Sequence, residues 1–143
     1  MKKKLFTMLL AIIGILSFAS CSKDDGDWNP MKWENYSYET TRLPNGTKVI
    51  RVPKSGGTFT FKCTNYNRLW IESVTEGFND KYVKNITSDN YTYIETNSTT
   101  VQAEGNTLTV TFAPNETQTE REVRVYVSVG DTGDKLVFCQ LAE

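Results

Sequence analysis

Polar and apolar residues alternate with a period of two over most of the chain after residue 47. In the segment 57–63, Phe59, Phe61 and Cys63 share one face and polar residues occupy the other. The segments 107–112 and 121–129 repeat this pattern, and the second places four valines on one face. Alternation of this kind is typical of half-buried β-strands. These three segments therefore predict strands.

Weaker patterns predict four more strands, at 48–52, 68–74, 91–95 and 134–141. Turn-forming residues at 44–46 and 55–57 separate strands, and the loop at 130–134 joins two of them as a hairpin. No helical period follows the first twenty residues, so the crossover helices that parallel sheets need are missing. We predict an all-β fold, an immunoglobulin-like antiparallel β-sandwich of about seven strands.

The N-terminus has the pattern of a secretory signal. Lysines at 2–4 precede an apolar run at 5–18, which is too short for a bilayer span of roughly 20 residues. Small residues then lead to Cys21, and the stretch resembles a bacterial lipobox, although Phe18 stands where Leu is usual. The resemblance implies that residues 1–20 are a lipoprotein signal peptide and that Cys21 carries the lipid. An ordinary signal with an incidental cysteine is the alternative.

The residues after Cys21 refine the expected location. Lys23, Asp24 and Asp25 resemble the lipoprotein export signal of Bacteroidetes, in which a lysine and two acids follow the lipidated cysteine. The resemblance implies an outer-membrane protein that is lipid-anchored and faces the cell exterior; a solvated acidic linker is the alternative. We therefore divide the chain into a signal peptide at 1–20, an acidic tether at 21–32 and a β-sandwich domain at 33–143.

Composition excludes several classes of function. Loss of the lysines at 2–4 leaves 13 of the 16 basic residues against 17 acidic ones, which argues against nucleic-acid binding. The chain has no histidine, so Ser-His-Asp and Cys-His catalysis and His-ligated zinc are excluded. We expect no enzyme activity, no metal and no cofactor. The carboxylate pairs Glu72 and Glu76, and Glu120 and Glu122, are interpreted as residues of solvent-facing strand positions.

An ordered set of residues resembles the BACON domain (Bacteroidetes-associated carbohydrate-binding, often N-terminal). The set consists of Pro53, Gly56, Gly57, Asn65 or Asn67, Trp70, Asn115, Arg121 and Gln140. The resemblance covers about residues 48–141 and departs at 79–105, a polar segment rich in Asn and Thr. It implies an immunoglobulin-like sandwich on a cell-surface protein, with a carbohydrate-binding role.

Aromatic residues supply the candidate binding chemistry, because sugar rings have an apolar side that stacks on flat aromatic faces. In the family pattern the place of Trp70 is structural, so we expect its side chain in the core. Tyr82, Tyr91 and Tyr93 lie in the divergent segment and are the candidate residues for binding glycan or mucin. A half-buried edge strand is the alternative interpretation of these tyrosines.

Two further groups of residues receive structural predictions. Trp28, Trp33, Tyr36 and Tyr38 are expected to form a first strand or to cap the sandwich. Cys63 and Cys139 are predicted to remain free, because strand phase places Cys63 on the inner face and Cys139 on the outer face. Side chains on opposite faces of a sheet cannot reach the Cβ separation of a disulfide.

The sequence thus leaves two functions open. One is a glycan- or mucin-binding module; the alternative is a spacer or accessory subunit that packs on a larger outer-membrane protein assembly without binding sugar. An exposed cluster of tyrosines favours the first function, and a flat apolar patch of several hundred Å² favours the second.

Overall fold

The computed structural model describes residues 29–78, 81–86 and 91–142, with side chains described for 29–77 and 91–142. The predicted signal peptide, the lipid attachment site Cys21 and the export signal Lys23, Asp24 and Asp25 lie outside the described residues. So do Trp28 and the side chain of Tyr82.

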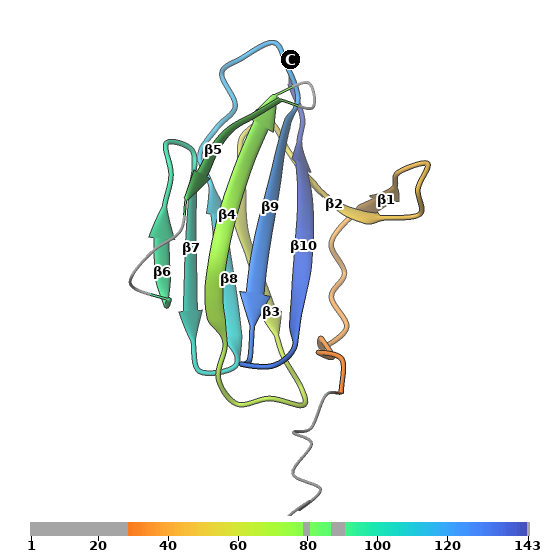
Figure 1. Cartoon of the computed structure of the whole chain (residues 1–143). Coiled ribbons are helices and arrows are strands. Elements are labelled where there is room, and N and C mark those ends of the chain that lie inside the picture. The colour runs from red at the N-terminus through yellow and green to blue at the C-terminus, as the bar shows by residue number, and fades with distance from the viewer. Residues whose placement is uncertain (1–28, 79–80, 87–90, 143) are drawn as a thin grey trace, which may run out of the picture.

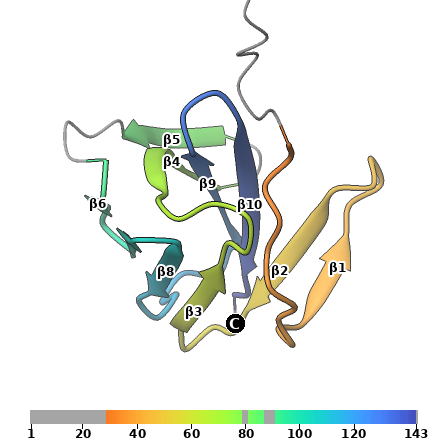
Figure 2. The same ribbon diagram turned by 90° about the horizontal axis from the view of Figure 1, so that it is seen from below.

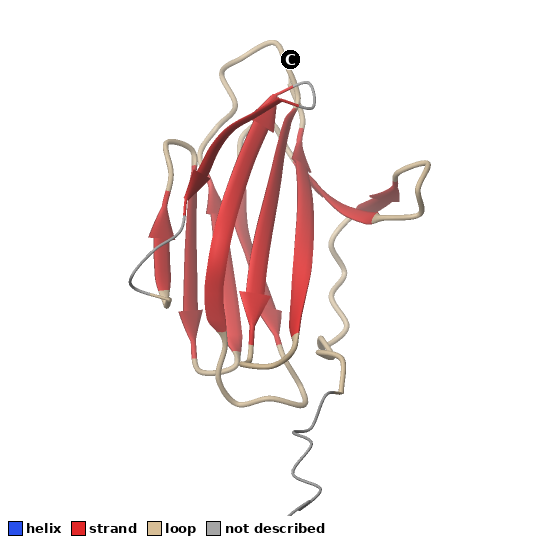
Figure 3. Cartoon of the chain, viewed as in Figure 1, coloured by secondary structure: helices blue, strands red, loops and turns tan. Residues whose placement is uncertain are grey.

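The described residues form ten strands and no helix (Figure 3). The strands are β1 (Thr40–Arg42), β2 (Lys48–Val52), β3 (Gly57–Lys62), β4 (Trp70–Phe78), β5 (Lys81–Ile86), β6 (Tyr93–Glu95), β7 (Thr99–Glu104), β8 (Thr107–Phe112), β9 (Arg121–Ser128) and β10 (Gly133–Gln140).

Two sheets stack face to face, one of six strands in the order β1-β2-β10-β9-β4-β5 and one of four in the order β3-β8-β7-β6 (Figures 1 and 2). The fold is therefore the predicted immunoglobulin-like β-sandwich. One pairing corrects the expectation of a wholly antiparallel fold, because β2 runs parallel to β10 from Ile50 to Val52. The β1–β2 hairpin then projects away from the sandwich (Figure 1).

All seven predicted segments contain strands, and β1, β5 and β7 were not predicted. Every residue of β1 is exposed, so its sequence carries no apolar alternation. In β7 the buried positions Thr99, Val101 and Ala103 do alternate with less buried ones, but small and polar side chains conceal the pattern. Backbone pairing with β8 along the whole of β7, from Thr99 to Glu104, supplies what the sequence pattern lacks.

Four phenylalanines fill the space between the sheets. Phe59 and Phe61 on β3 contact Phe138 on β10 edge to face, with ring centroids 6.1 and 5.8 Å apart. Phe112 on β8 lies 5.1 Å from Phe138. Offset and edge-to-face pairs add attraction to the area that they bury. This cluster connects β10 in the larger sheet to β3 in the smaller sheet.

The segment before β1 packs against the same cluster and confirms the predicted cap. Trp33 forms an isolated antiparallel bridge with Cys63, and its ring lies 6.3 Å from that of Phe61. Tyr36 and Tyr38 contact Phe61 at 5.0 and 5.5 Å. This N-terminal arm, residues 29–39, therefore closes one side of the sandwich.

Both described cysteines are free, as predicted. Cys63 is fully buried, whereas Cys139 is half-buried and faces the other side of its sheet. Phe138 and Gln140 point inward and are fully buried. The outward Val137 is also only 3% exposed, so β10 is apolar on both faces.

The end of the sandwich where β9 begins is closed by buried polar side chains. Arg121 donates from Nη1 to the Gln140 side-chain oxygen at 3.1 Å and from Nη2 to the Asn115 oxygen at 3.3 Å. The Gln140 amide donates to the carbonyl of Ala113 at 2.7 Å. The Asn115 amide donates to two further carbonyls, including that of Leu141. Three of the residues that carry the family resemblance thus form one hydrogen-bonded network, which we call the closed end.

Candidate functional site

The alternation of inward and outward side chains at the start of β4 decides which residues reach the site. Leu69 and Ile71 are 1% and 0% exposed and belong to the core. Trp70 lies between them, so its side chain faces the opposite side of the six-stranded sheet and is only partly buried. The expectation that Trp70 packs in the core is therefore wrong. Its ring lies on the outer surface, with the Arg68 guanidinium carbon 5.7 Å from its centroid.

An irregularity in β4 places two successive side chains on this outer surface. The register of β4 against β9 shifts between Ile71 and Ser73, which is a β-bulge at Glu72. Ile71 and Val74 both point inward, while Glu72 is exposed and Ser73 is partly exposed between them. Glu72 accepts a hydrogen bond from the Ser128 hydroxyl on β9. The bulge therefore directs a carboxylate across the face of the neighbouring strand.

These residues line a hollow of about 480 Å³ at the end of the sandwich where β4 begins and β9 ends. Its lining consists of Trp70, Glu72, Tyr91, Ser128 and Gly130. Gly130 lies in the β9–β10 loop, and a Cβ atom there would be 3.6 Å from the Trp70 ring. The loop backbone thus forms one wall beside the indole. We call this region the open end.

Tyr91 reaches the open end through a backbone contact. The Ile71 amide donates to the Tyr91 carbonyl at 2.6 Å. This hydrogen bond holds the turn before β6 against the first residues of strand β4. The Tyr91 side chain is 52% exposed. An indole and a phenol therefore line the same hollow, one partly buried and one open to solvent.

The other two tyrosines predicted for the site are placed differently. Tyr93 is 41% exposed but begins β6 in the four-stranded sheet, and it is not among the residues that line the hollow. Its hydroxyl donates to Glu95 at 3.0 Å, and this hydrogen bond raises the pKa of the Tyr93 phenol. The side chain of Tyr82 is not among those that the structure describes.

One of the four predicted solvent-facing carboxylates is buried. Glu76 is 8% exposed and accepts hydrogen bonds from the hydroxyls of Thr96 and Ser98, the second at 2.7 Å. This corrects the expectation for Glu76, because the β6–β7 turn covers the end of its strand. Glu122 pairs with Arg124, and Glu72 and Glu120 are exposed. The two members of each predicted pair thus have different structural partners.

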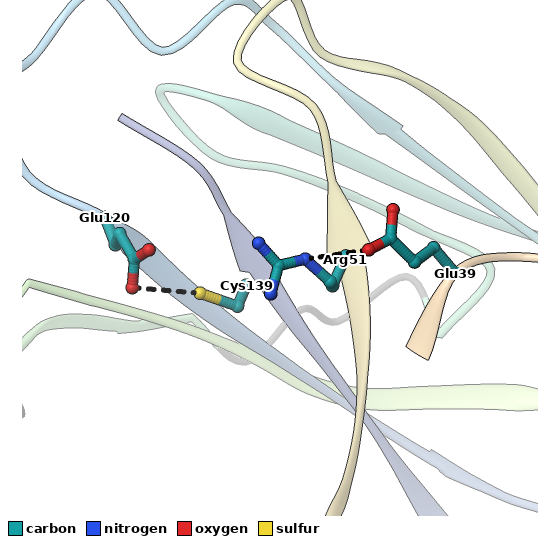
Figure 4. Close-up of polar contacts among 4 residues, drawn as sticks. All are labelled: Glu39, Arg51, Glu120 and Cys139. Atoms are coloured by element: carbon teal, nitrogen blue, oxygen red, sulfur yellow. Dashed lines mark hydrogen bonds and ion pairs between the residues drawn. The ribbon is translucent and has the colours of Figure 1, made fainter. Parts of the chain in front are cut away.

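A row of polar residues crosses the outer face near the closed end (Figure 4). Arg51 pairs with Glu39 at 3.3 Å, and the Cys139 thiol donates to Glu120 at 3.6 Å. Burial and the neighbouring Glu120 raise the pKa of the Cys139 thiol to about 11. A thiol that stays protonated at neutral pH is a poor nucleophile. This row therefore does not offer a reactive cysteine.

Within the described part of the chain, no group of three or more acidic or cysteine side chains is placed to hold a metal ion. The same residues include no helix that is long and apolar enough to cross a membrane.

Comparison with known proteins agrees with the fold. The chain is a β-sandwich with immunoglobulin-like topology, and it resembles a protein from Bacteroides thetaiotaomicron whose structure was solved by NMR. The two chains are 31% identical, the match covers 87% of this chain and 98% of the other, and the TM-score is 0.63. At this identity and coverage, the chain belongs to the same family as that Bacteroides protein. No family model and no curated protein matches the chain.

Proposed function

We propose that this protein is a non-enzymatic lipoprotein of the outer membrane, displayed at the cell surface, that binds glycan at the open end. The observation that carries the proposal is the pairing of Trp70 and Tyr91 around a hollow that also holds the carboxylate Glu72. Aromatic faces stack on the apolar side of a sugar ring, and polar groups at the rim receive its hydroxyls. The hollow offers both kinds of group within one concave surface.

The distribution of exposed apolar side chains favours binding over a spacer role. Among the described residues, Tyr91 and Tyr93 are the large hydrophobic side chains that are exposed. Both carry a hydroxyl, and they belong to different surfaces. A broad apolar patch, which a packing subunit would present to its partner, is not found among the described residues.

The proposed location rests on the N-terminal pattern. A positive start, a short apolar run and small residues before Cys21 support lipidation, and Lys23, Asp24 and Asp25 support export to the surface. Membership of a family with a Bacteroides protein supports the interpretation of that export signal.

Glycan binding is tested with the chain from residue 21 onward, carrying Cys21→Ser to keep it soluble. A glycan array identifies a ligand, and affinity electrophoresis on mucin glycans then compares single variants. We expect Trp70→Ala and Tyr91→Ala each to weaken retention by about tenfold or more, because each removes a stacking face. Tyr93→Ala is the matched control, since it removes another exposed tyrosine that lies outside the hollow, and it should leave retention unchanged.

Two results would contradict this proposal. If the unmodified protein is retained by no glycan, binding is abandoned and the spacer function takes its place. If Tyr93→Ala weakens retention and Tyr91→Ala does not, the site lies on the four-stranded sheet instead. Thermal unfolding of each variant separates loss of a binding face from loss of the fold.

The anchor is tested by cell fractionation. Cys21→Ala should release the protein from membranes, because the acyl chains attach at that thiol. Replacing Lys23, Asp24 and Asp25 together with alanine should leave the protein lipidated but inaccessible to surface labelling. Unchanged labelling of the triple variant would contradict the export signal.

A further inference from the structure

The hollow at the open end does not stand alone on its face of the sheet. A second hollow of about 530 Å³ adjoins it and is lined by residues of β4, β9 and β10, including Tyr126 and Lys135. The two hollows share Glu72 and Ser128, so the hydrogen bond between these residues lies at their junction.

A third hollow continues the line beyond β10. It has a volume of about 290 Å³ and is lined by residues of the N-terminal arm, β2 and β10, including Tyr36 and Lys48. It shares Asp134 and Lys135 with the second hollow. The strands β4, β9 and β10 are adjacent in the sheet and β2 follows them (Figure 1). The shared residues therefore place the three hollows in succession, with the third beside β10 where the N-terminal arm packs.

Each hollow is lined by an aromatic ring that has an exposed cation near it. Lys135 and Lys48 also line their hollows, whereas Arg68 lies beside the Trp70 ring outside the lining. The Arg68 guanidinium carbon lies 5.7 Å from the centre of the Trp70 ring. The Lys135 ammonium lies 5.9 Å from the Tyr126 ring. The Lys48 ammonium lies 4.5 Å from the Tyr36 ring. Because a cation–π contact at an exposed site is weak, these three charges stay accessible to an anion.

The carboxylates of the line are already engaged by the protein. Glu72 accepts from the Ser128 hydroxyl. Asp134 accepts from the Trp33 indole nitrogen at 2.7 Å and from the backbone amide of Lys135 at 2.7 Å. These hydrogen bonds hold both carboxylates in place along the line, where they are exposed to solvent, as are the three cations beside the rings.

We infer that the three hollows form one groove for a linear acidic glycan of several sugar units, an inference that rests on the proposed glycan function. Sugar rings stack on Trp70, Tyr126 and Tyr36, and carboxylate or sulfate groups of the chain lie beside Arg68, Lys135 and Lys48. The fixed carboxylates repel an acidic group placed between these stations, so the spacing of charge along the glycan sets its register.

Chain length gives the first test. Oligosaccharides of increasing length from one retained polysaccharide are titrated by calorimetry against the chain from residue 21 onward with Cys21→Ser. Affinity should rise until the fragment spans the groove. Tyr126→Ala should then weaken binding of the longest fragment by about tenfold. It should not change the affinity for a fragment that fills only the Trp70–Tyr91 hollow. Equal effects of Tyr126→Ala on both fragments, or no effect on either, would overturn the groove.

Charge gives the second test, with polysaccharides in matched pairs that differ only in charge. Suitable pairs are polygalacturonate and its methyl ester, and chondroitin sulfate and its desulfated form. We expect the acidic member of at least one pair to be retained more strongly, with affinity that falls as salt rises. Lys135→Gln should weaken that retention several-fold. Lys62→Gln removes an exposed lysine from β3 in the other sheet and should have no effect.

The outcomes separate this inference from the proposed function. Retention of neutral and acidic members to the same extent, or of the neutral members more strongly, refutes the acidic ligand and leaves glycan binding intact. Retention of no member of any pair, nor of any neutral glycan on the array, refutes both.

Discussion

The two ends of strand β9 contrast in how their polar groups are satisfied. At its first residue, Arg121 is 6% exposed and donates to Asn115 and Gln140, which are both fully buried. At its last residue, Ser128 donates to the exposed Glu72, and both residues line an open hollow. The closed end pairs its polar groups within the protein, whereas the open end displays aromatic faces and a carboxylate to solvent.

This difference separates residues that maintain the fold from residues that are available for binding. A buried polar group costs free energy unless it is hydrogen-bonded, so each member of the closed end depends on the others. Side chains at the open end retain contact with water and are replaced at lower cost. Substitutions at the closed end should therefore act on stability, and those at the open end on binding.

The largest effect is expected for Gln140→Ala at the closed end. The side chain is fully buried and its amide contacts the Ala113 carbonyl and the Arg121 guanidinium. Truncation leaves a cavity and removes partners from buried groups, which should lower the free energy of unfolding by about 3–5 kcal/mol. Urea denaturation measures the loss. A cost below about 1 kcal/mol would show that water replaces the amide, and the contrast between the ends would weaken.

Gly56→Ala should have the next largest effect. A Cβ at Gly56 would lie 2.1 Å from the Phe112 carbonyl oxygen, and the residue has φ of 79°. We expect a loss of about 3 kcal/mol, since the backbone of β8 must move. The control is Gly46→Ala in the β1–β2 turn, where φ is 83° and nothing lies within 4 Å of the added atom. That variant should lose only the backbone strain, about 1–2 kcal/mol. Equal losses would show that the close approach to Phe112 relaxes freely.

A smaller effect is expected for Trp70→Ala at the open end. Its side chain is partly exposed and outside the core, so we expect a loss of about 1 kcal/mol, although it is the largest side chain of its strand. Leu69→Ala next to it removes a side chain that is 1% exposed and should cost about 2–5 kcal/mol. Chemical denaturation of the two variants decides the matter. A greater loss for Trp70→Ala would show that the indole packs in the core and is not part of the proposed binding surface.

The smallest effect concerns Cys139 near the closed end. Its pKa is raised from 9.0 to about 11, mainly by burial and then by Glu120. The folded protein therefore holds this proton more tightly than the unfolded chain, and the associated stability is full below pH 9 and is lost as pH rises through 11. The wild type should lose slightly more stability than Cys139→Ala between pH 8 and 11. Parallel curves for the two proteins would show that solvent screens the thiol.

The sequence predicted the sandwich well because its inner positions alternate clearly. The buried face of each strand can be read from the positions of Phe59, Phe61 and the valines of β9. Glycine and proline mark the turns between strands. The sheet pairings could not be predicted in the same way. The parallel contact of β2 with β10 joins residues nearly ninety positions apart, and no local pattern encodes it.

The candidate site was predicted only in part. The reason is that the sequence does not show which residues at the start of β4 face inward. Leu69, Trp70 and Ile71 are all apolar, so alternation does not show which of them points outward. The family pattern suggested the core for Trp70, and the structure places it outside. Tyr91 was predicted, but its neighbours Ser128 and Gly130 lie almost forty residues further along the chain. The bulge at Glu72, whose carboxylate accepts a hydrogen bond from Ser128, has no signal in the sequence.

The N-terminal arm leaves the sandwich beside the open end. Tyr66 and Asn65, in the connection that leads to β4, donate to the carbonyls of Asn29 and Pro30 at 2.6 and 3.0 Å. Asn29 lies eight positions after Cys21, and a chain of that length reaches at most roughly 30 Å. If Cys21 is anchored in the outer leaflet, the groove works within a few nanometres of its own membrane. In that case a ligand tethered to the same membrane would meet the proposed groove at a high effective concentration. A soluble polymer would gain no such increase in concentration and would have to reach the protein by diffusion.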